Sequence, residues 1–165
     1  MSPDLSDAIV DRAMFHIDNC YYLASVTVRG YRVKTNKVSN TAFRGFGGPQ
    51  GILAIENVIE EIASATGLDP LVVRQRNFYR PSDNRDTTHY GQRIEQHIIQ
   101  PLVARLIINS EYHKRKNEIH QFNKTSAVLK RGIAITPVKF GISFTVTHLN
   151  HCLLYTSPSP RDTEV

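Results

Sequence analysis

One stretch of the sequence constrains the fold more than any other: a glycine-rich loop that runs directly into an apolar helical pattern. The stretch is SNTAFRGFGGPQ, residues 39–50, and it places an arginine and two phenylalanines among its glycines. Glycine loses much conformational entropy on folding, and large aromatic side chains are usually buried. We therefore expect this loop to have a binding role.

A phosphate site is the first alternative for this loop. A glycine cluster before a helix can bind phosphate through its N–H groups and the helix dipole. However, residues 45–48 lack the G-x-G-x-x-G spacing, no Gly-Lys-Ser/Thr follows them, and no clear buried strand precedes them. As a dinucleotide-binding pattern the loop is weak.

Apolar periodicity predicts a helix on each side of the loop. The first spans residues 6–17, with Ser6 as its cap. The second has Pro49 in its first turn and ends at Gly67. Its buried side is predicted to consist of Ile52, Leu53, Ile55, Val58, Ile59 and Ile62.

Capping residues indicate further helices in the second half of the chain. Asp69-Pro70 is a cap followed by a proline at the first helical position, and it begins a helix that reaches about Tyr79. The polar run 80–88 is predicted to be a loop. Helical patterning resumes over residues 92–122, with a break or a new start near Pro101.

Two segments rich in β-branched and aromatic residues are predicted to form strands. They are residues 21–35, divided at Gly30, and residues 131–148, divided at Gly141. No strand–helix unit repeats, so the predicted fold class is α+β. We expect some strand edges to be unpaired within this chain alone.

Composition indicates a folded protein without a membrane span. The 165 residues are 41% hydrophobic, and no apolar run approaches the ~18 residues that a span needs. The N-terminus lacks the pattern of a signal peptide, which predicts a cytoplasmic setting. Two cysteines are too few for a disulfide framework or a zinc site, and His113 and His120 lack a third ligand.

The formal charge of +5 leaves an anionic partner open. The basic run at residues 113–116 is interpreted as a solvated helix face, since basic residues elsewhere alternate with acidic ones. The alternative is a basic nucleic-acid-binding module that uses Phe46 and residues 114–116. Steeply salt-dependent oligonucleotide binding would identify such a module.

The last residues differ in character from the rest. Residues 152–162, CLLYTSPSPRD, agree at every position with the in-frame translation of a transposase-type sequencing adapter. We interpret residues 152–165 as a non-native, disordered tail, and His151 as a replacement for a native glutamine. The Ser-Pro pairs and the C-terminal Thr-Glu-Val are therefore not taken as functional motifs.

Taken whole, residues 39–50 closely resemble the signature of the molybdenum hydroxylase family, in particular the molybdopterin-binding region of its xanthine dehydrogenases. Two further groups of blocks lie at matching distances: residues 11–19 (DRAMFHIDN) upstream, and residues 76–79 (RNFY) and 139–146 (KFGISFTV) downstream. The resemblance covers about residues 3–151. It implies a partial molybdopterin-binding domain over residues 1–151.

The resemblance implies an oxidoreductase of purine catabolism. In this family a molybdenum ion held by a pterin dithiolene inserts a water-derived oxygen into a purine C–H bond. Hypoxanthine and xanthine are the implied substrates. Electrons leave through 2Fe-2S clusters and FAD to NAD, in other domains or subunits, and the full enzyme is expected to be an oligomer.

The resemblance also implies roles for individual residues. Arg44 matches a residue that contacts the molybdenum–pterin centre, with its backbone near the metal, and Phe43 and Gly45 flank it as cofactor-binding residues. Phe46 matches an aromatic residue that meets the purine ring. The glycines of the loop are expected to let the backbone approach the cofactor.

Three more matches concern the substrate. Phe144 corresponds to a second aromatic residue that stacks on the face of the ring, and Thr145 to a substrate hydrogen-bonding residue. Arg12 corresponds to an arginine that binds the purine oxygen and favours purines over aldehydes. A guanidinium suits this role because it is planar, stays charged and stabilises negative charge that develops in the transition state.

No catalytic residue is assigned within this sequence. The family's general-base glutamate corresponds to a position downstream of the matched region. We therefore expect no turnover from this polypeptide alone, and no retention of the cofactor. The enzymatic alternative to a xanthine dehydrogenase is an aldehyde or N-heterocycle hydroxylase, against which Arg12 is the discriminating residue.

Overall fold

The computed structural model describes residues 5–38 and 40–141. In chain order its elements are α1 (Ser6–Phe15), α2 (Gly48–Thr66), α3 (Pro70–Asn77), the 3-10 turn η1 (Pro81–Asp83), α4 (Ile99–Asn109) and α5 (Tyr112–Thr125). The interpreted tail, residues 152–165, lies outside the described residues. Within the described ranges, none of the helices is long and apolar enough to cross a bilayer.

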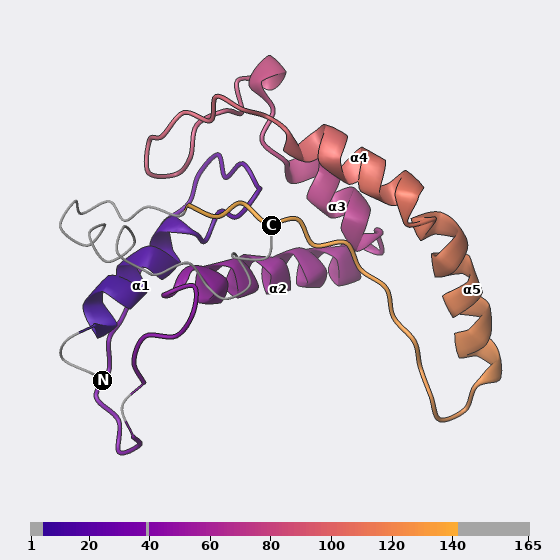
Figure 1. Ribbon diagram of the computed structural model, residues 1–165, viewed down its shortest axis with the longest axis horizontal. Helices are drawn as coiled ribbons and strands as arrows, with labels where there is room; N and C mark the ends of the chain where they lie inside the picture. The colour runs from indigo at the N-terminus through magenta and orange to yellow at the C-terminus, as the bar shows by residue number, and fades with distance from the viewer. Residues whose placement is uncertain (1–4, 39, 142–165) are drawn as a thin grey trace, which may run out of the picture.

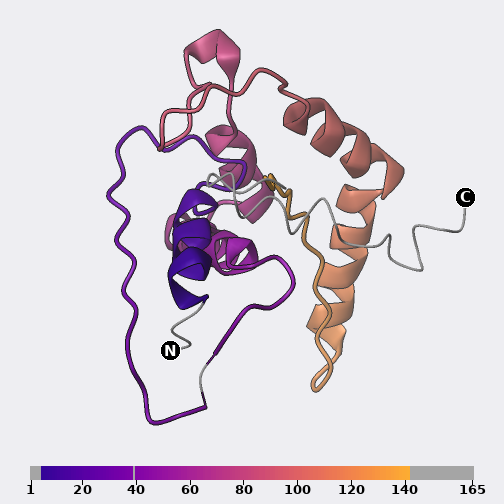
Figure 2. The same cartoon turned by 60° about the vertical axis from the view of Figure 1, so that its left-hand side comes forward.

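Helix α2 lies at the centre of the arrangement (Figure 1). Helix α1 packs against α2, α3 packs against α2 as well, and α4 continues into α5 along the outer side. After α5 the chain returns past α2 toward α1, as residues 126–141 (Figure 1). Figure 2 shows residues 23–38 leaving the helices in a wide loop. The return segment and α1 are thereby brought together although the sequence separates them widely.

Two glycines allow α1 and α2 to cross at backbone contact. Gly47 and Gly51 are one helical turn apart at the start of α2, and Gly51 is buried. A Cβ atom at Gly51 would collide with the carbonyl oxygen of Ala13, and one at Gly47 with that of Ile9. Gly47 also has a φ of 99°, a backbone conformation that residues with a side chain rarely adopt. Gly47 and Gly51 therefore determine how closely α1 and α2 pack.

We expect Gly51→Ala to lower the free energy of unfolding by about 1–3 kcal/mol, because a backbone atom of α1 must move to admit the methyl group. Gly132→Ala is the matched control, since nothing lies within 4 Å of a Cβ there. The control is expected to shift stability by about 0.5 kcal/mol or less. Urea unfolding measures both, and equal effects would contradict the backbone contact.

The capping residues of the central helices are largely as predicted. Helix α2 ends at Gly67, whose φ of 67° is left-handed, and Asp69 caps α3 by accepting a hydrogen bond from the Leu71 N–H at 2.9 Å. The predicted cap of α1 is wrong, because Leu5 occupies the N-cap position without a side-chain hydrogen bond. The long helical pattern forms two helices, separated at Glu111, which has a φ of 49°.

Half of the residues predicted to form the buried side of α2 are exposed, so this prediction is wrong for them. Ile55 and Ile59 are buried, whereas Leu53, Val58 and Ile62 are exposed by 62, 46 and 42%. The residues that α2 does bury are Gly48, Gly51, Ile55, Glu56, Ile59 and Ala63. Three of these six residues are Gly or Ala and one is an acid, because close helix packing selects size as well as apolarity.

The α+β prediction is not confirmed. Across the described residues the structure shows three isolated antiparallel bridges, Tyr21 with Phe78, Arg80 with Arg85, and Thr87 with Arg93, and no named strand. A β-ladder forms only where the backbone of a second strand lies beside that of the first. Segment 137–141 is extended, but side chains of the α1 region bind its backbone instead. The residues after 141 in the second predicted strand region lie outside the described residues.

Candidate functional site

Helix α1 holds Arg12 in a buried position, with only 7% of the residue exposed. The Nη2 group of Arg12 donates a hydrogen bond to the carbonyl oxygen of Gly141. Its guanidinium carbon lies over the Phe140 ring, 4.9 Å from the ring centroid. This contact is a cation–π interaction. Burial lowers the pKa of Arg12. A cation is therefore kept inside the protein, between α1 and the return segment.

His16 binds the same peptide from one helical turn further along. Its Nδ1 lies 2.9 Å from the Arg12 carbonyl oxygen, and the Gly141 N–H donates to its Nε2 over 3.1 Å. The His16 and Phe140 ring centroids are 4.8 Å apart. Burial lowers the pKa of His16, and its hydrogen bond to the Arg12 carbonyl opposes that shift. Both bonds are satisfied only by a neutral ring with its proton on Nδ1.

The glycine-rich loop reaches the same place from a third direction. Gly48 is buried, and a Cβ there would collide with the Phe140 ring. Arg12, His16, Gly48, Phe140 and Gly141 thus form one group, which we call the Arg12 cluster. Two of the predicted blocks, together with the loop, therefore converge around Arg12, and they are separated by up to 129 positions in sequence.

Phe46 is held in a strained backbone conformation within the loop. Its φ is 48°, and its neighbours Gly45 and Gly47 have φ values of 92° and 99°. A large aromatic residue is uncommon in this left-handed region, and such strain concentrates at functional sites. The Phe46 side chain is half-buried. The backbone there forms a turn, with the Phe46 N–H donating to Phe43 and the Gly48 N–H to Gly45.

The glycines of the loop have a role that differs from the expected one. Gly47 and Gly48 make room for Ile9 and for the Phe140 ring, so their small size serves contacts within the protein. Gly45 is half-buried and lies in the turn. The sequence indicated that backbone must approach something closely here, but it did not indicate that other parts of this chain fill that space.

Phe43 and Arg44 lie on the outer side of the turn. Phe43 is 83% exposed, and Arg44 is exposed as well. An exposed guanidinium beside an exposed ring and a glycine turn suits a planar, anionic ligand, because Arg binds oxyanions through its fork of N–H groups. These residues fit a pterin cofactor. Within the described ranges no group of three His, Cys, Asp or Glu residues could hold a metal ion directly.

Phe144 and Thr145, the other predicted substrate-binding residues, lie outside the described residues. A groove of about 460 Å³ between the extended segment 23–29 and α2 does not involve the predicted site. Its lining residues are Ile17, Leu23, Ser25, Val26, Thr27, Val28, Arg29, Ala54, Ile55 and Val58. The candidate site is therefore the Arg12 cluster and the adjoining loop.

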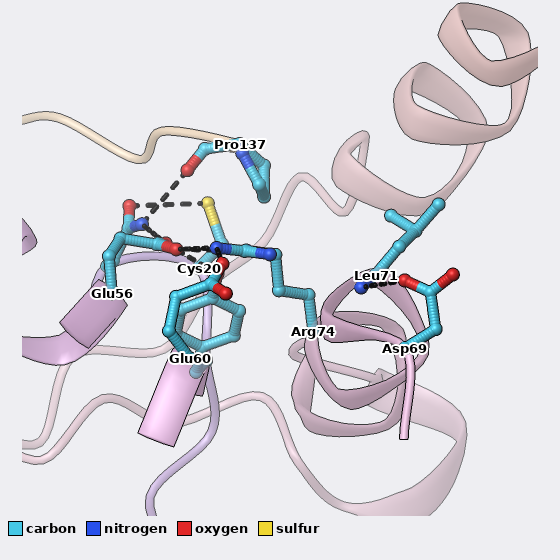
Figure 3. Close-up of polar contacts among 9 residues, drawn as sticks. Cys20, Glu56, Glu60, Asp69, Leu71, Arg74 and Pro137 are labelled. Atoms are coloured by element: carbon cyan, nitrogen blue, oxygen red, sulfur yellow. Dashed lines mark hydrogen bonds and ion pairs between the residues drawn. The ribbon is translucent and has the colours of Figure 1, made fainter. Parts of the chain in front are cut away.

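A buried polar network anchors the return segment next to this site (Figure 3). Asn19 is fully buried and adopts a φ of 44°. Its Nδ2 donates to the Pro137 carbonyl at 2.9 Å and to Glu56 at 2.8 Å, and its Oδ1 accepts from the Lys139 N–H at 2.9 Å. One side chain thus joins the end of the α1 region, α2 and the return segment.

Glu56 is the acceptor at the centre of the network. The Tyr21 hydroxyl donates to its Oε1, and the Arg74 guanidinium pairs with its Oε2 at 2.8 Å. Arg74 also pairs with Glu60 at 2.6 Å, and its side chain is 3% exposed. Burial alone would lower the pKa of Arg74, but its bonds to Glu60 and Glu56 raise it. Burial and the bond to Glu56 raise the pKa of Tyr21.

A second buried acid holds the return segment one residue before Phe140. Asp18 is fully buried, accepts a hydrogen bond from the Tyr79 hydroxyl at 2.6 Å and pairs with the Lys139 ammonium. Burial, and then the bond to Asp18, raise the pKa of Tyr79. The neighbouring Cys20 is buried, and burial raises the pKa of its thiol to about 12, so Cys20 is not a nucleophile near neutral pH.

The basic run on α5 is partly neutralised. Lys114 pairs with Glu111 at 2.9 Å, and Lys116 pairs with the Asp69 carboxylate. Burial would raise the pKa of Asp69, but the bonds from Lys116 and from the Leu71 N–H lower it. This arrangement supports the solvated-face interpretation over a nucleic-acid interface.

The sequence alone gives no site role to His16 or Phe140, which it shows only as members of the blocks 11–19 and 139–146. The signal that could have linked His16 to Arg12 is their spacing, since residues four apart lie on one face of a helix. Phe140 could be placed only through contacts across the fold.

Part of this region matches a known domain family. Residues 1–78 match the family model of the molybdopterin cofactor-binding domain. The chain is 48% identical over 149 residues to the xanthine dehydrogenase of Drosophila subobscura, and 46% identical over 147 residues to the xanthine dehydrogenase/oxidase of Felis catus. These alignments cover 90% and 89% of the chain, respectively.

The chain spans 11% of the length of these relatives. The matched domain contains α1, the glycine-rich loop, α2 and α3. Arg12, Phe43, Arg44, Gly45 and Phe46 therefore all lie within the residues that match the cofactor-binding domain. Residues 1–78 therefore match a molybdopterin cofactor-binding domain, and the chain is similar to a segment of the xanthine dehydrogenases.

Proposed function

We propose that this chain is part of a xanthine dehydrogenase-type oxidoreductase, which hydroxylates hypoxanthine and xanthine at a molybdenum–molybdopterin centre. One observation carries the proposal: a buried arginine, Arg12, lies against the Phe140 ring, which itself packs on the glycine-rich loop at Gly48, within a sequence 48% identical to a xanthine dehydrogenase. Burying a charge is costly unless it is compensated, and buried charged groups are common at functional sites, so a buried arginine beside a loop of a cofactor-binding domain supports a ligand-binding role.

On this proposal the outer side of the loop holds the cofactor. Phe43, Arg44 and Gly45 are the residues that would hold it. When bound, the cofactor supplies the molybdenum centre for hydroxylation of a purine carbon. The loop keeps its shape through the hydrogen bonds of its own turn, so it presents these groups without rearrangement.

On the same proposal, the substrate is bound by Arg12, Phe46, Phe144 and Thr145. Two aromatic rings hold a flat heterocycle by stacking, which contributes about 1–3 kcal/mol per ring. The Arg12 guanidinium is a planar fork of five N–H donors, which suits it to bind a purine oxygen. As hydroxylation proceeds, negative charge develops on the purine, and a fixed guanidinium stabilises that charge most in the transition state.

The remaining parts of the machinery belong to other segments. We propose that 2Fe-2S and FAD domains or subunits accept the electrons and pass them to NAD, in a cytoplasmic oligomer. The 165-residue chain alone is expected to show no turnover. Its extended segments would complete an α+β fold by pairing with strands contributed from outside residues 1–151. That pairing would explain why the described residues form no ladder by themselves.

A chimera tests the proposal. This chain's matched segment replaces the corresponding segment of a full-length xanthine dehydrogenase, and molybdenum content and xanthine oxidation are measured. We expect stoichiometric molybdenum and turnover with xanthine and hypoxanthine. A chimera that retains molybdenum but oxidises only aldehydes would show the related hydroxylase activity instead. A chimera that folds without molybdenum would overturn the proposal.

A further inference from the structure

The Gly141 peptide is bound at both ends by the same face of α1. Its carbonyl accepts from the Arg12 guanidinium, and its N–H donates to His16 Nε2 over 3.1 Å. The opposite nitrogen of His16 is bonded to the carbonyl of Arg12 itself, at 2.9 Å. A closed circuit of hydrogen bonds therefore links the Arg12 side chain, the Gly141 peptide, the His16 ring and the Arg12 backbone.

We propose that His16 is the positioning residue for Arg12: by binding the Gly141 N–H, it presents the Gly141 carbonyl to the guanidinium and fixes where that cation lies. The role of Arg12 in substrate binding rests on the proposed function. The geometry of the hydrogen-bond circuit is independent of that function.

The alternatives for His16 are weaker than this role. A histidine that only filled space would need no polar partner, yet both of its ring nitrogens are bonded while 8% of the residue is exposed. The ring also packs against Phe140, which in turn underlies the Arg12 guanidinium. His16 thus constrains both partners of Arg12 that the return segment supplies, the carbonyl and the ring.

Only one form of the ring closes the circuit. Nδ1 must carry the proton to donate to the Arg12 carbonyl, and Nε2 must lack one to accept from Gly141. Protonation would place an N–H against the Gly141 N–H and open the circuit. Burial is the largest effect that opposes this protonation, and the positive charges of Arg12 and Lys139 add to it. The hydrogen bond to the Arg12 carbonyl and the charge of Asp18 favour protonation.

Two substitutions separate the two nitrogens. In His16→Asn the amide N–H replaces the Nδ1 donor, and in His16→Gln the amide oxygen replaces the Nε2 acceptor. Both remove the aromatic ring, so loss of ring packing is matched between them. We expect the Gly141 amide to exchange with solvent about tenfold faster in His16→Asn than in the unmodified chain. His16→Gln is expected to restore most of the protection.

The measurement is NMR of the ¹⁵N-labelled 165-residue chain, which also reports the tautomer. The His16 ring should show protonated Nδ1 and unprotonated Nε2 above pH 7. Equal Gly141 exchange in the unmodified chain and His16→Asn, an unprotected Gly141 amide in the unmodified chain, or the opposite tautomer would each overturn the proposal.

The catalytic consequence is measured separately in the chimera. There, His16→Asn is expected to lower kcat/KM for xanthine by up to about 100-fold, since small displacements of a transition-state contact have effects of that size. Partial rescue by His16→Gln is expected, whereas equal activity of the two variants would overturn the positioning role. An unmodified chimera without molybdenum, combined with a protected Gly141 amide, would refute the proposed function and leave the circuit intact.

Discussion

Replacing Arg74 with methionine is expected to lower the free energy of unfolding by about 3–5 kcal/mol, because it leaves the Glu56 carboxylate buried without its cation. Methionine retains much of the volume, so the loss reports charge and hydrogen bonding more than packing. Urea unfolding followed by circular dichroism measures the change. A loss of this size exceeds that of any substitution proposed above for the helices.

Two controls distinguish an uncompensated charge from general damage. The double variant Arg74→Met with Glu56→Gln removes both charges and keeps an oxygen for Tyr21 and Asn19, so it should recover at least about half of the loss. Lys114→Met breaks an exposed pair with Glu111 and should cost about 1 kcal/mol or less. If the double variant were as unstable as Arg74→Met alone, the charge argument would fail.

In the chimera, replacing Arg12 with methionine is expected to lower kcat/KM for xanthine about 10²–10³-fold, the usual effect of removing one donor from a developing negative charge. Arg12→Lys should recover only part of this loss, because an ammonium lacks the planar fork and reaches a different position. Steady-state kinetics measures both variants. Oxidation of an aldehyde should fall less, since an aldehyde lacks the second oxygen that Arg12 is proposed to bind.

Arg12 also binds Gly141, so a structural loss must be separated from a catalytic one. Molybdenum content and the unfolding transition of each variant serve that purpose, and both are expected to stay close to those of the unmodified chimera. Unchanged kcat/KM in Arg12→Met with full molybdenum content would refute the substrate role.

The helices were predictable to the extent that local chemistry determines them. Asp69 followed by Pro70 placed the start of α3, and Gly67 placed the end of α2, because caps and left-handed glycines act within one turn. The buried face of α2 was not predictable in this way. Apolar residues surround most of that helix, so periodicity alone could not show that Gly51 and Glu56 face inward while Leu53 does not.

The sequence could nominate candidate site residues but not their arrangement. Its blocks made Arg12 and Phe46 candidates, but no spacing along the chain places Arg12 against Gly141, 129 positions away. The predicted strands failed within the described residues for a related reason. β-Branched composition describes one strand well, whereas a ladder depends on a partner whose position local sequence does not contain.

The return of residues 126–141 toward α1 has a consequence for biosynthesis. Asn19 binds the carbonyl of Pro137, 118 positions later, so its amide lacks this partner until the ribosome has added those 118 residues. At ordinary elongation rates that interval is about 6–24 s. During this time Asp18, Asn19 and Glu56 are exposed on an incomplete nascent chain. Residues 126–141 therefore complete this buried network late, and chaperones have the intervening seconds in which to bind its exposed side chains.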